Sequence, residues 1–445
     1  MRMNKQPEGR KMKQSDQFVN RKIGDKIYIL PIGQKAAGMV KGLSLNETGA
    51  FLWDALKENI SEEKLISISK EHFGISEDGI GMLEKDVSAF LKALRDRGML
   101  EGTKSIFGCS CSYCSDTVPM DRKSCFDNQD GTIAEEINGI RHHIDIEMGD
   151  IGVSLYGDES YFVNDFDHFK TGKLPENSMR IEVVPEEPEE MSEGYYDEEG
   201  SKDSADAEDK ADGLMEENGN VLIHQQDLTV LEFSGKYVLF FPKATRIYEV
   251  HIKKDGSLAR IYCEPGNEVK KQDIFWVIRI LFLVFALNNG LVMVHSASIL
   301  FKGKAWLFSG ASGSGKSTQS QLWKNVFDVP VINGDLNLVG MKDGKPVIYG
   351  TPWCGSSGVF DNKIYPLGGI ILLRRGNNTI QELTYDQKVL YVQQRIISPT
   401  WTEDMFDRGL KIVEDIVPGT YIKRFYCNKE DESAVCIHDD IERYL

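Results

Sequence analysis

A glycine-rich motif of eight residues constrains this chain more than any other feature. It has the sequence Gly310-Ala-Ser-Gly-Ser-Gly-Lys-Ser317 and fits the pattern GxxxxGK[ST] of phosphate-binding loops. The apolar residues 305–308 before it are typical of a strand, and residues 318–325 after it are typical of a helix. Glycines let backbone N–H groups approach phosphate oxygens, and the helix N-terminus adds a positive dipole end. The motif therefore predicts an α/β unit that binds a nucleoside triphosphate.

The side chains of the motif have separate expected roles. Lys316 would neutralise the β- and γ-phosphates, and Ser317 would ligate Mg²⁺. A second metal ligand is expected at the end of the apolar run 329–335, where Asp335 could bind Mg²⁺ directly or through water and could also act as the base. The alternative for Asn-Gly-Asp is a simple turn at a strand end. The residues expected to contact the nucleotide are Gly310, Ser312, Gly313, Ser314, Gly315, Lys316, Ser317 and Thr318.

Charge is distributed unevenly along the 445 residues. The chain has 52 Lys and Arg against 69 Asp and Glu, a formal net charge of −17. Residues 186–217 hold 15 acidic residues and two lysines, so this tract carries −13 and the rest of the chain only −4. This balance disfavours a nucleic-acid partner, because phosphate contacts need clustered cations. Residues 185–220 contain few apolar side chains, and we expect them to form a disordered acidic insertion.

Nothing in the sequence predicts a membrane partner or a secretion signal. Residues 1–25 are polar and basic, without the apolar core of a signal peptide. The longest apolar run, residues 274–287, is interrupted by Arg279 and is too short to cross a bilayer. We expect it to be a buried helix. Eight cysteines without such a signal favour a reducing cytoplasm, so we expect a cytoplasmic protein.

The region from residue 18 to residue 101 shows the periodicity of a small domain. Residues 26–30 have a strand pattern, and Asn46 is suited to begin a helix. A second helix is expected over 62–73. The third has one apolar face and ends before Gly98; its face consists of Ile80, Leu83, Val87, Phe90, Leu91 and Leu94.

A linker over residues 102–137 contains a cluster of cysteines. Four thiolates could close a tetrahedral Zn²⁺ site. The CxCxxC spacing departs from the usual CxxC pairs, so free thiols or redox pairing are the favoured alternative. The four residues are Cys109, Cys111, Cys114 and Cys125.

The remaining residues, 138–445, combine two patterns. Strand-like runs on both sides of the acidic tract are consistent with one sheet that the tract interrupts. The α/β pattern from residue 273 onward includes separate strands at 291–294 and 299–301 and a helix over 386–397.

Several ordered motifs in the C-terminal half resemble those of the HPr kinase/phosphorylase C-terminal domain superfamily, and more specifically its kinase-like relatives outside the HPr system. The resemblance covers about residues 220–437 and implies a P-loop fold akin to phosphoenolpyruvate carboxykinase. It also implies phosphoryl transfer from a nucleotide to a serine hydroxyl, and a homo-oligomer. The motifs are Val294-His-Ser-Ala-Ser298, the phosphate loop, Ile332-Asn-Gly-Asp335, Gly350-Thr-Pro-Trp-Cys-Gly355 and Tyr365-Pro-Leu-Gly-Gly369.

This resemblance also implies site residues. His295 matches a histidine near the transferred phosphate, although it could instead be a core histidine. HPr kinases carry two aspartates after the loop, the first usually being the base, and Gly334 replaces the first here. The base could therefore be Asp335, His295 could assist it, or catalysis could be weak. Arginines are expected near the transferred phosphate because charge spreads over its oxygens. The candidates, each with surface charge as its alternative, are Arg374, Arg375 and, most favoured, Arg395.

The N-terminal region resembles a second family. Leu45-Asn-Glu-Thr-Gly-Ala-Phe-Leu-Trp53, with a strand before it and Arg97-Gly-Met-Leu100 at the end, is similar to PqqD-like domains. These are small winged-helix elements that bind leader peptides of ribosomally made natural products. The resemblance implies that a leader adds as a strand to the sheet edge. The alternative is a winged-helix module for oligomerisation or DNA binding, and acidic residues around the third helix disfavour DNA.

These features predict a multidomain α+β and α/β protein. A winged-helix PqqD-like domain would occupy residues 18–101, and a P-loop kinase domain would occupy 138–445 with an insertion at 185–220. The expected function is ATP- and Mg²⁺-dependent phosphorylation of a Ser or Thr in a precursor peptide, held through its leader close to the site. The alternatives are a catalytically weak nucleotide-binding regulatory or scaffold protein and a kinase of a small metabolite such as free serine.

Overall fold

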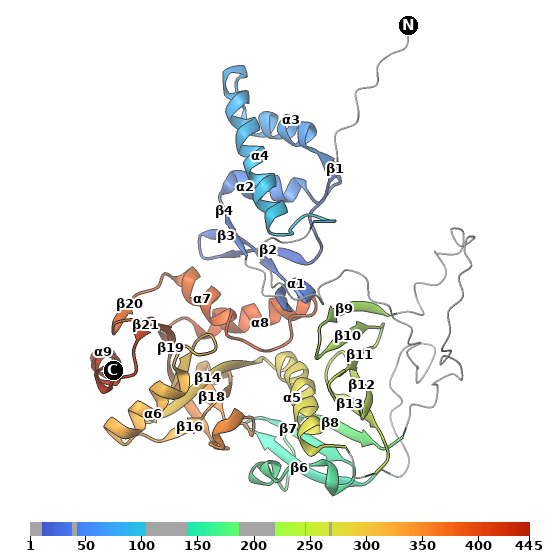
Figure 1. The fold of residues 1–445 in the computed structure, drawn as a ribbon, viewed down its shortest axis with the longest axis vertical. Helices are drawn as coiled ribbons and strands as arrows, with labels where there is room; N and C mark the ends of the chain where they lie inside the picture. Colours follow the sequence, from blue (N-terminus) through green and yellow to red (C-terminus); the bar gives the residue numbers. More distant parts are fainter. Residues whose placement is uncertain (1–10, 38–41, 104–139, 187–218, 245, 267–268) are drawn as a thin grey trace, which may run out of the picture. The chain divides into compact units, whose positions relative to one another are not determined.

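The protein divides into two units. The computed structural model describes residues 11–37, 42–103, 140–186, 219–244, 246–266 and 269–445 (Figure 1). One unit spans Met1–Cys114 with Thr400–Glu403, and the other spans Ser115–Pro399 with Asp404–Leu445. The four cysteines of the expected linker and most of the acidic tract lie outside the described residues.

The described part of the first unit combines helices with a small antiparallel sheet in the order β2-β3-β4 and a short pairing of β1 with β5. Its strands are β1 (Lys11–Met12), β2 (Phe18–Ile23), β3 (Lys26–Pro31), β4 (Leu43–Leu45) and β5 (Ile60–Ser61). Its helices are α1 (Gly33–Ala37), α2 (Glu47–Ala55), α3 (Glu62–Phe73) and α4 (Ile80–Asp96).

Local signals fix the ends of these helices. The side chain of Asn46 accepts a hydrogen bond of 2.8 Å from the backbone N–H of Gly49, so it caps α2 as its position predicts. Gly74 has a φ of 61° and ends α3 in the left-handed conformation. The apolar face of α4 is buried in the same core as Trp53. Its buried residues are Leu83, Val87, Leu91 and Leu94.

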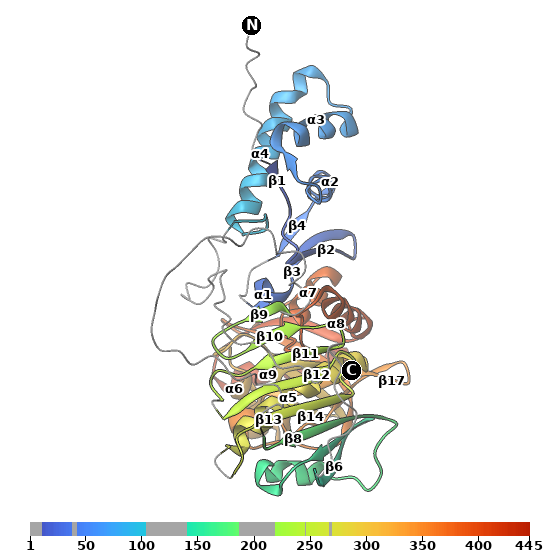
Figure 2. The same cartoon turned by 90° about the vertical axis from the view of Figure 1, so that its right-hand side faces the viewer.

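The second unit contains two eight-stranded sheets with helix α5 (Lys271–Asn288) between them (Figures 1 and 2). The first sheet, here called the β6–β13 sheet, is antiparallel except where β8 pairs in parallel with β7 and β13. Its order is β6 (His142–Met148), β7 (Ile151–Tyr156), β8 (Asn177–Val184), β13 (Leu258–Cys263), β12 (Ile247–Lys253), β11 (Lys236–Phe240), β10 (Thr229–Glu232) and β9 (Asn220–His224).

The two strands that flank the acidic tract, β8 and β9, belong to this one sheet. Helix α5 contains the apolar run that the sequence predicts as a buried helix, and it contacts β8 on one side and β14 on the other. No helix of the described ranges is both long and apolar enough to cross a membrane.

The second sheet, here called the loop sheet because it carries the glycine-rich loop, has the order β15-β14-β17-β18-β19-β21-β20, with β16 beside β14. Strand β15 also pairs with β19, so β15, β14, β17, β18 and β19 close a ring. The strands are β14 (Leu291–Phe301), β15 (Lys304–Ser309), β16 (Val331–Asn333), β17 (Leu336–Lys342), β18 (Lys345–Tyr349), β19 (Ile364–Arg375), β20 (Thr379–Gln381) and β21 (Tyr421–Cys427).

The helices of this part of the chain are α6 (Lys316–Phe327), α7 (Tyr385–Gln393), α8 (Glu403–Ile416) and α9 (Asp431–Tyr444). Helices α6 and α9 pack together over a core that includes Trp306, Trp323 and Phe425.

The prediction of two strands at 291–294 and 299–301 is wrong, because β14 is one continuous strand. The polar residues between the two runs stay in the sheet because they are hydrogen-bonded there. The Oγ of Ser298 donates to Oδ1 of Asn337 at 2.6 Å, and Nδ2 of Asn337 donates to the carbonyl of Ser296 at 2.6 Å.

Candidate active site

The glycine-rich loop lies between β15 and α6, as the motif predicts. Gly313 and Gly315 have φ angles of 71° and 106°, a region that residues with a Cβ rarely adopt. A Cβ at Gly310 would lie 2.4 Å from the Oγ of Ser314, so this position also requires glycine. Helix α6 begins at Lys316, and its free N–H groups therefore lie at the end of the loop.

Parallel pairing explains which other segments reach the loop. Strands β15, β19 and β21 run parallel, and Leu372 is opposite both Ser309 and Arg424. The carboxyl ends of parallel strands meet at one sheet edge, where α/β proteins bind ligands. The loop, the residues after Leu372 and the end of β21 are thus neighbours.

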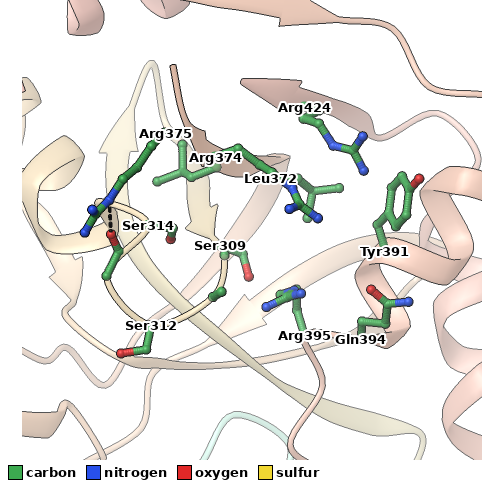
Figure 3. A pocket seen from close by; sticks show the side chains of 14 residues that line it. Ser309, Ser312, Ser314, Leu372, Arg374, Arg375, Tyr391, Gln394, Arg395 and Arg424 are labelled. Carbon is green, nitrogen blue, oxygen red and sulfur yellow. Dashed lines mark hydrogen bonds between the residues drawn. The ribbon is translucent and has the colours of Figure 1, made fainter. Parts of the chain in front are cut away.

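A cavity of about 440 Å³ opens at this edge (Figure 3). Its lining includes the first part of the loop, and four arginines contribute to it, but of the described residues around it none is acidic. Arg375 turns toward the loop and donates from Nε to the carbonyl of Gly313 at 3.0 Å. The guanidinium carbon of Arg424 lies 4.2 Å from the centroid of the Tyr391 ring, a cation–π contact.

Arg374 and Arg395 extend into the cavity toward each other (Figure 3). Burial lowers the pKa of the Arg395 guanidinium, and the positive charge of Arg374 lowers it further. The backbone carbonyl of Arg395 accepts a hydrogen bond of 2.9 Å from the N–H of His295, which fixes this segment beside β14. The predicted arginine candidates therefore come together at one cavity.

Lys316 is half-buried at the start of α6. Its Nζ donates to the carbonyl of Gly310 at 3.4 Å. Burial lowers the pKa of the Lys316 amine, Asp335 raises it, and Arg395 lowers it. These three charged groups therefore share one electrostatic environment. Lys316, Ser317 and Thr318 line a second cavity of about 690 Å³ on the other side of the loop.

The side chains of His295 and Asp335 contact each other. The Nε2 of His295 lies 3.0 Å from Oδ1 of Asp335, and their side chains are 36% and 33% exposed. The turn that carries Asp335 is held by Asn333, whose Oδ1 accepts from the N–H groups of Asp335 and Leu336 at 2.9 and 3.0 Å. The hydrogen bond from His295 is the largest influence lowering the pKa of Asp335, and burial opposes it. Asp335 is therefore held as a carboxylate.

The structure explains why glycine, rather than a larger residue, occupies position 334. A Cβ at this position would lie 2.1 Å from the Oγ and 2.4 Å from the Cβ of Ser357. The Oγ of Ser357 donates to the carbonyl of Cys354 at 2.7 Å, so its position is fixed. The loop around residues 354–358 thus occupies the space that a first aspartate would need.

Sequence reasoning treated Arg279 only as an interruption of an apolar run and did not assign Arg424 at all. The Nε of Arg279 is buried without a hydrogen-bond partner among the described residues. Burial lowers the pKa of Arg279, while Asp335 raises it, so the guanidinium is within electrostatic reach of that carboxylate. The sequence feature that could have indicated a role for Arg279 is that it is a single cation within an otherwise apolar helical run.

The donor set at Asp335 fits Mg²⁺. Oδ1 is engaged by His295, whereas Oδ2 has no hydrogen-bond partner in the described part of the chain. A carboxylate oxygen and the hydroxyl of Ser317 are hard ligands of the kind Mg²⁺ prefers. Elsewhere in the described ranges, no group of three or more His, Cys, Asp or Glu is placed to hold a metal ion. The predicted Zn²⁺ ligands Cys109, Cys111, Cys114 and Cys125 lie outside those ranges.

Comparison with known proteins bears mainly on the first unit. Residues 38–100 match the family model described as Coenzyme PQQ synthesis protein D (PqqD). This part of the chain is PqqD-like. The resemblance noted from Leu45–Trp53 is therefore confirmed. No curated protein matches the chain.

Two solved structures are similar to parts of the chain. TbiB1 in complex with the TbiA(beta) leader peptide is 24% identical, with 21% of this chain and 100% of that chain covered and a TM-score of 0.18. The Hpr(Ser) kinase/phosphatase from Coxiella burnetii is 9% identical, with 34% and 95% covered and a TM-score of 0.21. Both resemblances seen in the sequence thus recur among the matches. Likenesses at these TM-scores carry no functional weight.

Proposed function

We propose that this chain is an ATP- and Mg²⁺-dependent kinase for a Ser or Thr hydroxyl of a ribosomally made precursor peptide, whose leader is bound by the PqqD-like domain. One observation carries the kinase assignment. A glycine-rich loop leads into α6 beside Lys316 and the His295–Asp335 pair, at a sheet edge with a cationic cavity. Each part of this arrangement matches a need of phosphoryl transfer.

The loop binds the phosphate chain of ATP. Backbone N–H groups and the N-terminus of α6 donate to phosphate oxygens, and the Oγ of Ser314 is buried without a partner among the described residues. Lys316 and Arg395 stabilise the negative charge on the transferred group. Ser317 and Asp335 would hold Mg²⁺, which would supply neutralisation of the phosphate charge.

In the reaction, the acceptor oxygen forms a bond to the γ-phosphorus, and the bond from that phosphorus to the β,γ-bridging oxygen breaks, so that ADP leaves with the electron pair. The proton of the hydroxyl goes to Nδ1 of His295. Because the Asp335 carboxylate accepts from Nε2–H, the lone pair of the ring is on Nδ1, which has no partner among the described residues. Asp335 orients this imidazole.

This assignment accounts for the missing first aspartate. Ser357 fills that space, and the adjacent imidazole takes over the proton. Since the transition state of phosphoryl transfer is loose, the demand on a base is small, and an imidazole can meet it.

The PqqD-like domain supplies substrate selection. The edge strands of its sheet are β2 and β4, and an extended leader can add to such an edge through backbone hydrogen bonds. Binding of the leader raises the effective concentration of the tethered core peptide at the kinase site. Selectivity for the precursor then resides in the leader rather than around the hydroxyl.

Intact-mass analysis of a candidate precursor peptide, incubated with the full chain, Mg²⁺ and ATP, tests the proposal. We expect a gain of one phosphate that is lost with Lys316→Ala and with a leaderless peptide. Transfer that is equal with and without the leader contradicts the role of the first unit. ATP binding without transfer to any peptide contradicts the kinase function and favours a nucleotide-binding scaffold. The observation that favours this alternative is Gly334, which stands where a catalytic aspartate is expected.

A further inference from the structure

The cationic cavity contains more positive charge than a nucleotide requires. In P-loop proteins, the phosphate chain is neutralised by the loop amides, the loop lysine and Mg²⁺, and one arginine commonly completes the transition-state site. Lys316 and Arg395 already fill these roles here. Arg374 and Arg424 are additional, and of the described residues that line the cavity none can neutralise them as a carboxylate.

Arg424 lies on the side of the cavity away from the glycine-rich loop, and Arg374 lies between that side and the loop. Figure 3 shows the loop serines and Arg375 at one side, and Tyr391 and Arg424 at the other, with the guanidinium of Arg374 between them. Thr318, which follows the loop, lines the second cavity instead. Thr318 and the arginines Arg374 and Arg424 therefore line different cavities.

Contacts with neighbouring residues position the arginines on this side of the cavity. Arg424 is held over the ring of Tyr391 and donates to Oε1 of Gln381 at 3.3 Å. Arg374 lies two residues beyond Leu372, and therefore on the same face of β19, so its position follows from the sheet. The guanidinium groups of Arg374 and Arg424 both contribute to the cavity, and no carboxylate is among the described residues that line it. Such a pair is stabilised when an anion occupies the cavity.

We propose that the acceptor presents a second anionic group, a carboxylate or a phosphate, next to the hydroxyl that is phosphorylated, and that Arg374 and Arg424 bind this group. The proposal rests on the kinase function proposed above and names its substrate class. Three sources supply the same chemistry: the C-terminal carboxylate of a terminal serine, an adjacent acidic side chain, and an adjacent phosphorylated residue. A planar guanidinium suits each of them because it forms two parallel hydrogen bonds to such an anion.

The test uses three matched pairs of small probes, each titrated into the full chain with Mg²⁺ and a non-hydrolysable ATP analogue. The pairs are N-acetylserine against its amide, N-acetyl-Ser-Asp-amide against N-acetyl-Ser-Asn-amide, and N-acetyl-Ser-phosphoSer-amide against N-acetyl-Ser-Ser-amide. Ligand-observed NMR gives each Kd. We expect the charged member of at least one pair to bind about tenfold more tightly than its neutral partner, the order of one charge-assisted hydrogen bond. The pair that discriminates identifies the source of the anion.

Variants locate the effect. Arg374→Gln should reduce the ratio within that pair to less than about twofold, and Arg424→Gln should reduce it independently in case the first variant folds poorly. Arg443→Gln is the matched control, because its side chain is 74% exposed on α9. Affinity for the ATP analogue should remain unchanged in all three variants.

Two outcomes overturn the proposal. One is equal binding within all three pairs, or no binding of any charged probe at millimolar concentration. The other is a loss of affinity for the ATP analogue in Arg374→Gln with the pair ratio unchanged, which assigns the arginine to the nucleotide. Failure of the kinase function itself looks different, because the wild-type chain and Lys316→Ala would then bind the analogue equally.

Discussion

The two eight-stranded sheets of the second unit both carry charged side chains, but those of the β6–β13 sheet are buried in pairs, whereas those at one edge of the loop sheet face a cavity. In the β6–β13 sheet, Glu182 is fully buried, its Oε2 accepts from Nε of Arg260 at 2.6 Å, and its Oε1 lies 2.6 Å from Nε of Arg180. At the edge of the loop sheet, Arg374 and Arg395 extend into a cavity whose described lining holds no acidic residue. Buried paired charges serve the fold, whereas a cluster of cations without protein counter-ions is a candidate site for an anionic ligand.

The β6–β13 sheet extends this pairing to neighbouring strands. Nε2 of His251 lies 2.7 Å from Oε1 of Glu249, and Nζ of Lys236 lies 3.4 Å from Nδ1 of His251. All three side chains are buried. The number of buried charges is therefore a poor guide to function in this protein. What distinguishes the loop sheet is that its cations have no protein counter-ion around the cavity.

The largest expected effect is on stability, in the β6–β13 sheet. Glu182→Ala removes the carboxylate that pairs with the buried guanidinium of Arg260, and we expect the free energy of unfolding to fall by about 3–5 kcal/mol. Denaturant unfolding measures this. A loss below about 1 kcal/mol would show that the pair is not needed and would remove the contrast between the sheets.

Lys316→Ala should show the opposite pattern. We expect transfer of phosphate to fall by about 10²–10³-fold, the usual cost of removing one group that stabilises transition-state charge, with little change in stability. Radiolabelled phosphate transfer measures the first effect, and thermal unfolding measures the second. Unchanged transfer would exclude the glycine-rich loop as the catalytic phosphate site.

Arg395→Gln sharpens the comparison because it removes an unpaired cation. Transfer should fall by about tenfold to 10²-fold, while the midpoint of thermal unfolding without nucleotide should stay the same or rise, since like charge on Arg374 is relieved. The matched control is Arg443→Gln. A clear loss of stability in Arg395→Gln, comparable with that of Glu182→Ala, would mean that Arg395 has a structural role.

The smallest expected effect concerns the pH dependence of Mg²⁺ binding. In the wild-type chain the pKa of Asp335 lies below its ordinary 3.8, so the carboxylate is present throughout the neutral range and is lost only below about pH 4. His295→Ala removes the largest influence lowering this pKa and leaves burial, which raises it. The pKa therefore rises, and binding of the Mg²⁺–nucleotide complex should weaken a few-fold more between pH 7 and pH 5 than in the wild type.

His295→Gln is the control for this experiment. Its amide can still donate to Asp335, so the pH profile should remain close to that of the wild type even though the variant has no proton acceptor for catalysis. Identical pH profiles for the Ala variant and the wild type would contradict a functional coupling of His295 to Asp335.

The glycine-rich loop could be located from the sequence because its conformation is determined within a few residues. Glycines at 313 and 315, a strand before them and a helix after them are sufficient, and the structure places all of these as the motif predicts. The PqqD-like region was equally accessible, since Asn46 and the apolar face of α4 are local signals.

Features that depend on distant contacts were not predictable. The continuity of β14 through Ser296 and Ser298 depends on Asn337, about forty residues later. The reason for Gly334 is the side chain of Ser357. Arg424 reaches the cavity only because β21 pairs in parallel with β19. In each case the partner is specified by the topology of the sheet, which a single sequence does not contain.

The contact between Gly334 and Ser357 also restricts how this chain can change over generations. An aspartate introduced at 334 alone would collide with the side chain of Ser357. A substitution that removes the Ser357 hydroxyl alone would abolish its hydrogen bond to Cys354 without adding a carboxylate to the site. The two positions are therefore epistatic. Under the proposed mechanism, histidine-based proton transfer could be exchanged for a two-aspartate site only if both positions change, because the Cβ of Ser357 as well as its hydroxyl obstructs a side chain at 334.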